Sequence, residues 1–97
     1  MFVKLTQKHI DAGERGKSKT CPVALAIQET IHHPVIVVGA AFSLKGSLRV
    51  WCLPHKVIKF IQDFDDGYVK VQPMHFKLPD KIMIEANELN RSRGAIL

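Results

Sequence analysis

The residues best suited to chemistry in this chain lie in a short basic segment that leads into a predicted helix. Three cations, Arg15, Lys17 and Lys19, precede a threonine, a cysteine and a proline at the helix start. The first turn of a helix leaves backbone N–H groups unpaired and carries the positive end of the helix dipole, so nearby cations reinforce a field that favours anions. We therefore expect one anion- or partner-binding site, made of Arg15, Lys17, Lys19, Thr20 and Cys21.

The glycine in this segment does not make it a nucleotide-binding loop. Gly16, Lys17 and Ser18 match the end of a phosphate-binding P-loop, but that motif needs a further glycine at the position that Asp11 occupies. It also needs a strand that runs directly into the loop, and none is predicted here. Hydrolysis of a nucleoside triphosphate is therefore excluded.

Cys21 is a candidate nucleophile, because a cysteine at a helix start beside cations can have a lowered pKa. Catalysis also needs a base and a third group that orients it, and the sequence places no histidine beside Cys21. We therefore expect no enzyme and no catalytic residue, with a thiol-dependent enzyme built on Cys21 as a remote alternative.

The histidines and cysteines do not predict a metal site. Cys21, Cys52 and the pair His32-His33 lack the closely spaced ligands of structural zinc sites. We expect no metal and no cofactor. The other histidines are expected at the surface: His9, His55 and His75.

Arg49 and Trp51 are a possible secondary contact, because they alternate along one expected strand. An aromatic ring beside a cation can stack on a nucleic-acid base, although the core is the preferred place for Trp51. No sequence signature of a nucleic-acid recognition fold accompanies them.

Composition indicates one globular domain, and the excess of basic residues fits either an acidic partner or a surface charge that keeps the protein in solution. The chain has 97 residues, 46% of them hydrophobic, and a net charge of +5 that is concentrated in residues 1–60. The N-terminus lacks the apolar core of a signal peptide, and no apolar run is long enough to span a bilayer. Two cysteines in no disulfide pattern indicate a reducing compartment, so we expect a cytoplasmic protein with no membrane partner.

The N-terminal elements must position the basic segment. Residues 2–5 alternate like a strand, and Thr6 is expected to cap a short helix that Gly13 ends in the left-handed conformation. Thr20 is then expected to cap a helix that is apolar nearly all round, is buried centrally, and ends before Pro34.

The second half of the chain predicts a sheet and an amphipathic helix. Residues 35–42 and 48–53 are expected to form a hairpin around Lys45-Gly46, and a helix should run from Pro54 to Gly67. A further strand is expected from Tyr68 to Leu78, with a bulge or an edge position at Pro73. The expected core residues are Val23, Ala24, Ile27, Ile36, Val38, Val50, Phe60, Ile61 and Phe64.

These elements predict an α+β fold, in which an antiparallel sheet packs against a buried helix with two further helices. Residues 1–79 are expected to form the α+β core domain, and residues 80–97 a C-terminal helix or tail. Residues 81–89 fit either a helix or a strand, with the helix preferred, and residues 90–97 are expected to fray.

Two patterns resemble a family of small uncharacterised proteins from phages and prophages. They are Thr6-x-x-His9-Ile10-x-x-Gly13, and Cys21-Pro-Val-Ala-Leu-Ala-Ile27 with the later Leu53-Pro54 and Phe64-Asp-Asp-Gly67. The resemblance covers residues 5–78 and implies a non-enzymatic accessory protein in the host cytoplasm. Such a protein would bind and block a host or defence protein, or a nucleoprotein complex with an acidic surface. Direct nucleic-acid binding through the basic N-terminal half is the alternative.

Overall fold

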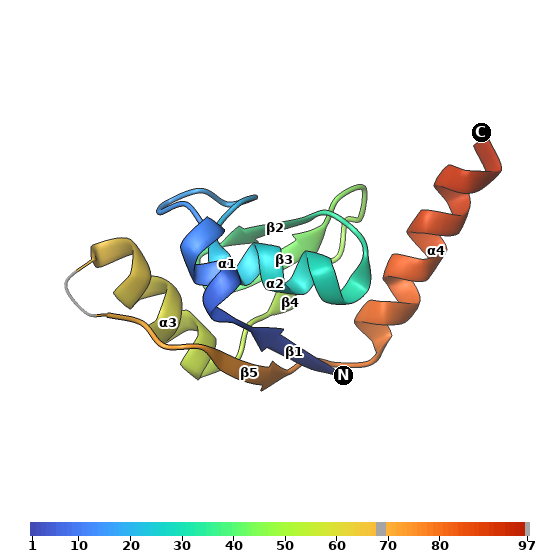
Figure 1. Cartoon of the computed structure of the whole chain (residues 1–97). Coiled ribbons are helices and arrows are strands. Elements are labelled where there is room, and N and C mark those ends of the chain that lie inside the picture. Colours follow the sequence, from blue (N-terminus) through green and yellow to red (C-terminus); the bar gives the residue numbers. More distant parts are fainter. Residues whose placement is uncertain (68–69, 97) are drawn as a thin grey trace.

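The computed structural model describes residues 1–67 and 70–96, and within them the chain forms the predicted α+β fold (Figure 1). Both sheets are antiparallel, one with strand order β1-β5 and the other with order β2-β3-β4. The elements in chain order are β1 (Phe2–Leu5), α1 (Gln7–Ala12), α2 (Pro22–Ile31), β2 (Val35–Val38), β3 (Ala41–Leu44), β4 (Trp51–Cys52), α3 (His55–Asp66), β5 (Met74–Lys77) and α4 (Lys81–Ile96).

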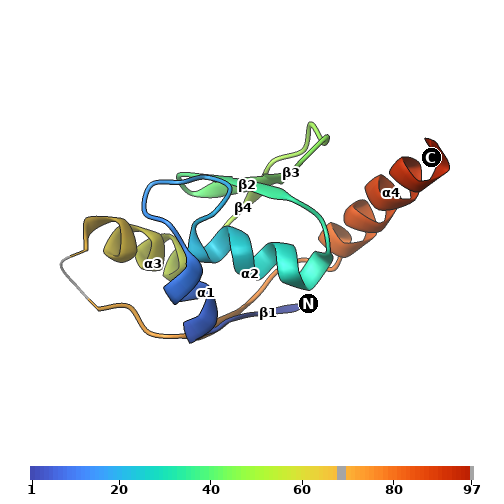
Figure 2. The same cartoon turned by 45° about the horizontal axis from the view of Figure 1, so that its top comes forward.

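Helix α2 lies between the two sheets, with β1 and β5 on one side and β2 and its neighbours on the other (Figures 1 and 2). Val23, Ala24 and Ile27 are completely buried, as predicted. A helix that is apolar on all sides needs cover on all sides, and two sheets provide it. The prediction of a buried central helix is therefore confirmed.

The prediction of a hairpin around Lys45-Gly46, with residues 35–42 and 48–53 as its two strands, is wrong. The run 35–42 is broken by Gly39, whose φ of 59° permits a tight turn, so that β2 pairs with β3 in the register Val38↔Ala41. The turn at Lys45-Gly46 exists, but it connects β3 to residues 47–50, which lie outside the sheet. Only Trp51–Cys52 then pairs with β3 as β4.

Three residues predicted in the core lie elsewhere. Val38 and Val50 are 66% and 70% exposed, and Ile36 is half-buried, whereas Val35 and Val37 point at α2 and are buried. Alternate strand residues point to opposite faces, and α2 covers one face of this sheet. A continuous apolar run does not reveal which alternate set is covered, so the prediction chose the wrong set.

The ends of the two N-terminal helices also differ from the prediction. Gly13 has an extended conformation with φ −73°, not a left-handed one, and a Cβ there would lie 2.4 Å from the Pro22 ring. Glycine is therefore required by the close approach of α1 to α2. Thr20 is not the N-cap of α2, because the helix begins at Pro22 and the residue before it is Cys21. The carbonyl of Thr20 accepts the N–H of Glu14.

The amphipathic helix before Gly67 is confirmed as α3. Val57 and Phe60 are buried, Ile61 and Phe64 are half-buried, and Gly67 ends the helix with φ 74°. The strand predicted from Tyr68 to Leu78 is shortened to Met74–Lys77 (β5), which pairs with β1. No strand precedes it in residues 70–73, so no bulge forms at Pro73, and Tyr68 and Val69 lie outside the described residues.

Residues 81–96 form helix α4, which confirms the preferred helix and extends it through the predicted frayed tail as far as Ile96. Its first half packs into the core through Ile82 and Ala86, and its second half projects from the body (Figures 1 and 2). Buried His33 links α4 to the turn that follows β3. Its Nε2 donates to the Lys45 carbonyl at 2.8 Å, and its Nδ1 lies 2.7 Å from the Asn90 Oδ1. No helix among the described residues combines the length and apolarity required to cross a bilayer.

Candidate partner-binding surface

The basic loop, residues 13–20, is fastened to the body of the protein at two points. The Val37 N–H of β2 donates to the Ser18 carbonyl at 2.8 Å, and the Gly16 N–H donates to Asp65 Oδ1 of α3 at 3.1 Å. Within the loop, the Cys21 N–H donates to the Lys17 carbonyl at 2.9 Å. The loop therefore lies along the outer edge of β2 as a defined element, shown in blue in Figure 2.

The three cations of the predicted site do not converge. The guanidinium of Arg15 lies over the Phe64 ring, 5.9 Å from its centroid, and against Gly67, where a Cβ would lie 3.1 Å from it. A cation is favoured at the C-terminal end of α3 by the helix dipole and by the aromatic face. Lys17 and Lys19 remain exposed and form no ion pair with any described residue.

The helix start that was expected to attract an anion borders a small pocket of about 250 Å³. Lys17, Ser18 and Cys21 line it, but so does the carboxylate of Asp65. A fixed negative charge repels an anionic ligand, so the pocket as a whole does not present the purely cationic lining that the sequence suggested.

Cys21 lacks the lowered pKa expected of a reactive thiol. Its side chain is buried, and burial raises the pKa of the thiol, with a smaller upward contribution from the charge of Asp65. The amides of Val23 and Ala24 act in the opposite direction but do not outweigh burial. The thiol is therefore protonated at neutral pH.

Arg49 and Trp51 are brought together by an acidic residue of α4. The Trp51 Nε1–H donates to Glu85 Oε1 at 3.5 Å, and Arg49 Nε lies 3.6 Å from Glu85 Oε2. Trp51 is half-buried, and Glu85 is 8% exposed. The indole thus helps to dock α4 and does not present a free ring for stacking.

The sequence reasoning missed a patch on the sheet face that points away from α2. We call it the outer face. Val38, Ala41 and Cys52 lie in one cross-strand row, and a hollow of about 150 Å³ beside it is also lined by Ile36 and Val50. None of these side chains is charged. The β-branched run that builds the patch was visible in the sequence, but nothing in it indicated exposure.

Cations lie beside the outer face. The loop with Lys17 and Lys19 follows the edge of β2. Lys45 directly follows β3, and its N–H donates at 2.9 Å to the carbonyl of Pro34, the residue before β2. Lys45 is exposed and has no ion-pair partner among the described residues, and Leu48, three residues further along the chain, is fully exposed. An uncharged patch with a cationic border is a feature of surfaces that bind other proteins.

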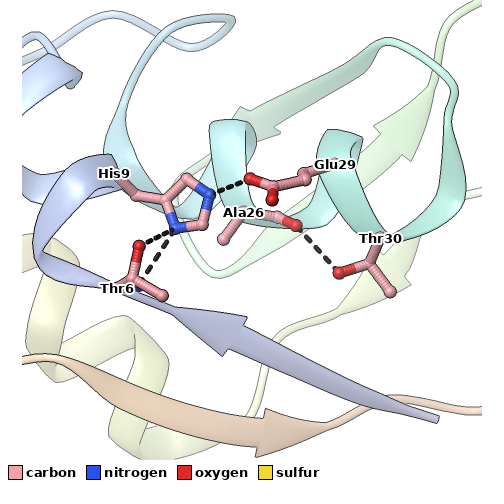
Figure 3. Close-up of polar contacts among 5 residues, drawn as sticks. All are labelled: Thr6, His9, Ala26, Glu29 and Thr30. Atoms are coloured by element: carbon pink, nitrogen blue, oxygen red, sulfur yellow. Dashed lines mark hydrogen bonds and ion pairs between the residues drawn. The ribbon is translucent and has the colours of Figure 1, made fainter.

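His9, expected at the surface, is buried between α1 and α2 (Figure 3). Its Nδ1 accepts the Thr6 N–H at 3.0 Å and lies 3.1 Å from Thr6 Oγ1, while its Nε2–H donates to the Glu29 carboxylate. A hydroxyl, an imidazole and a carboxylate are the components of a nucleophilic triad. Here the Nδ1 lone pair already accepts the backbone N–H of Thr6, so it is not free to take the hydroxyl proton. Thr6, His9 and Glu29 instead hold α1 against α2.

Comparisons with known proteins add no functional assignment to this geometry. No protein-family model, curated protein or solved structure matches the chain. In residues 1–67 and 70–96, no group of three or more His, Cys, Asp or Glu side chains is arranged to hold a metal ion.

Proposed function

We propose that this chain is a small, basic, non-enzymatic binding protein of the phage accessory type. It captures a host or defence protein, or a nucleoprotein complex, through a surface with acidic residues, and blocks that partner by covering it. The observation that carries the proposal is the uncharged outer face with Lys17, Lys19 and Lys45 beside it.

The outer face favours a protein partner over bare nucleic acid. Burial of apolar side chains such as Val38 and Val50 stabilises a protein interface, whereas phosphates offer them nothing to pack against. The lysines at the border would meet carboxylates and raise the association rate. Stacking of a nucleic-acid base on Trp51 is disfavoured, because that ring is half-buried against α4.

The proposal is tested by retention of a partner from host lysate on immobilised wild-type protein and on two variants. Val38→Asp places a charge on the outer face, and Phe2→Asp places one on a similarly exposed apolar residue of the other sheet. We expect Val38→Asp to lose the partner and Phe2→Asp to keep it. Equal retention by both variants would remove the outer face from the interface.

A gel shift with mixed DNA and RNA separates the alternative function. Direct nucleic-acid binding would give a shift that weakens steeply as salt rises and that is the same for Val38→Asp as for the wild-type protein. We expect no shift at physiological salt.

A further inference from the structure

We propose that the exposed face of the sheet β1-β5 binds a single strand of nucleic acid, weakly and without sequence preference. We call this surface the lysine face, and its members are Phe2 and Lys4 of β1, His75 and Lys77 of β5, and Lys56 of α3. It belongs to a different sheet from the outer face, so the inference goes beyond the proposed function and does not depend on it.

The lysine face follows from the alternation of side chains along two paired strands. The buried residues of both strands point at α2, and the residues between them point the other way. The register places Phe2 opposite Lys77 and Lys4 opposite His75, and all four residues are exposed. In Figures 1 and 2 this sheet lies at the lower border of the molecule, with its free face turned to solvent.

The lysine face contains cations and no carboxylate. Lys4, Lys56 and Lys77 are exposed and form no ion pair with any residue that the structure describes. Lys56 is held against β5, because its ammonium donates to the His75 carbonyl at 2.7 Å. The charge of Asp80, three residues after Lys77, is already met by the terminal amino group at 2.6 Å. Three cations on one surface therefore remain available to a chain of phosphates.

An aromatic ring lies among these cations. The ammonium of Lys77 is 5.9 Å from the centroid of the Phe2 ring, and the ring of His75 stands at 70° to it with the centroids 6.0 Å apart. Phe2 nevertheless remains 62% exposed. The neighbours thus orient the ring and leave room for a nucleic-acid base to stack on it.

A shallow hollow of about 330 Å³ extends the same face towards α1. Lys4 and His75 line it together with Leu5, Pro73 and Met74, and no acidic residue does. It gives space for a further base of the same strand, next to cations that reach the phosphates.

A single strand suits this surface better than a membrane or a duplex. Binding at a membrane surface grows with the apolar area that enters the lipid, and of the large apolar side chains exposed in the described chain only Phe2 belongs to the lysine face. The bases of a duplex are stacked on one another and do not reach a protein ring. Cations combined with an exposed aromatic ring are the features of surfaces that bind single strands without sequence preference.

The test measures the fluorescence anisotropy of a short labelled oligothymidylate at low salt. We expect binding that weakens as salt rises, with a slope of about −2 for log K against log salt concentration, because each of three phosphate contacts contributes about −0.7. So weak a complex is lost at physiological salt, where no gel shift is expected.

Two pairs of variants separate stacking from charge. Phe2→Tyr keeps an aromatic ring and should bind like wild type, whereas Phe2→Leu should bind about fivefold more weakly or worse, the effect of losing one stacked base. Lys4→Gln should make the salt slope shallower by about 0.7. Lys17→Gln removes a cation of the basic loop, outside the lysine face, and should leave the slope unchanged.

Three results would overturn the inference. They are equal affinity of Phe2→Tyr and Phe2→Leu, a change of slope in Lys17→Gln instead of Lys4→Gln, and equally tight binding of polyglutamate or of phosphatidylserine vesicles. The second result would place the nucleic acid on the basic loop. None of them bears on the outer face, whose role is decided by retention of the lysate partner on Val38→Asp.

Discussion

The carbonyl of Ser18 accepts the N–H of Val37 at 2.8 Å, and this bond joins the basic loop to β2, an edge strand of the sheet β2-β3-β4. It places Lys17 and Lys19 beside the outer face instead of leaving them on a free loop. It also satisfies a strand N–H that would otherwise be open to pairing with another chain. One backbone contact thus organises the cationic border and protects one edge.

Removal of the two exposed loop cations should weaken partner binding without affecting folding. We expect Lys17→Ala/Lys19→Ala to lower the affinity for the partner at least tenfold, about 1.4 kcal/mol, chiefly through the association rate and less at high salt. Association and dissociation rates measured at two salt concentrations check this. Arg15→Ala is the control, because Arg15 is engaged with Phe64, and its loss should change stability by about 0.5–1 kcal/mol with little effect on binding. A double variant that binds like wild type at low salt would contradict the role of the loop.

Gly13→Ala should destabilise the fold by steric overlap alone. The new Cβ would lie 2.4 Å from the Pro22 ring, while the backbone of residue 13 is in a region that alanine adopts freely. We expect a loss of about 1–3 kcal/mol in the free energy of unfolding, measured with urea. In a Pro22→Ala background, where the ring is absent, adding Gly13→Ala should cost less stability than it does in the wild-type protein. A Gly13→Ala protein as stable as wild type would show that α1 and α2 can separate at no cost.

Acid should weaken the clamp between α1 and α2. The hydrogen bond that His9 donates lowers the pKa of Glu29 below its ordinary value. A carboxyl whose pKa is lower in the folded state stabilises it above the unfolded pKa, and this contribution disappears as pH falls through the folded pKa. Unfolding free energies across the acid range should therefore fall less steeply for Glu29→Gln than for wild type. Parallel curves for the two proteins would contradict the link between His9 and Glu29.

The two cysteines should differ strongly toward a thiol reagent. Cys52 is exposed on the outer face, whereas Cys21 is buried with a raised pKa, so one thiol should react quickly and the other only after unfolding. Labelling of wild type and of Cys52→Ser over a pH series checks this, and Cys52→Ser should lose the fast phase. If Cys21 reacts quickly as a thiolate in mildly acidic solution, the thiol-dependent enzyme becomes the better explanation.

The sequence by itself determined the elements whose faces follow from local pattern. Helix α2 is apolar nearly all round from Val23 to Ile27 and is buried there, and α3 carries its apolar residues on one stripe and ends before Gly67. The exposure of Lys17 and Lys19 was also predictable, because a short charged segment cannot be buried without partners. These properties depend on the periodicity and polarity of neighbouring residues, which a sequence shows directly.

Tertiary structure alone decided which surfaces became available. Val35–Val38 is apolar throughout, and only the position of α2 selects Val35 and Val37 for burial and leaves Val38 outside. His9 is buried because Glu29, in the next helix, lies within reach of its ring, and Arg15 leaves the other loop cations because the end of α3 attracts it. Each outcome depends on a contact with a residue distant in the chain, or on which of two apolar strand faces another element covers. The local sequence pattern gives no information about either.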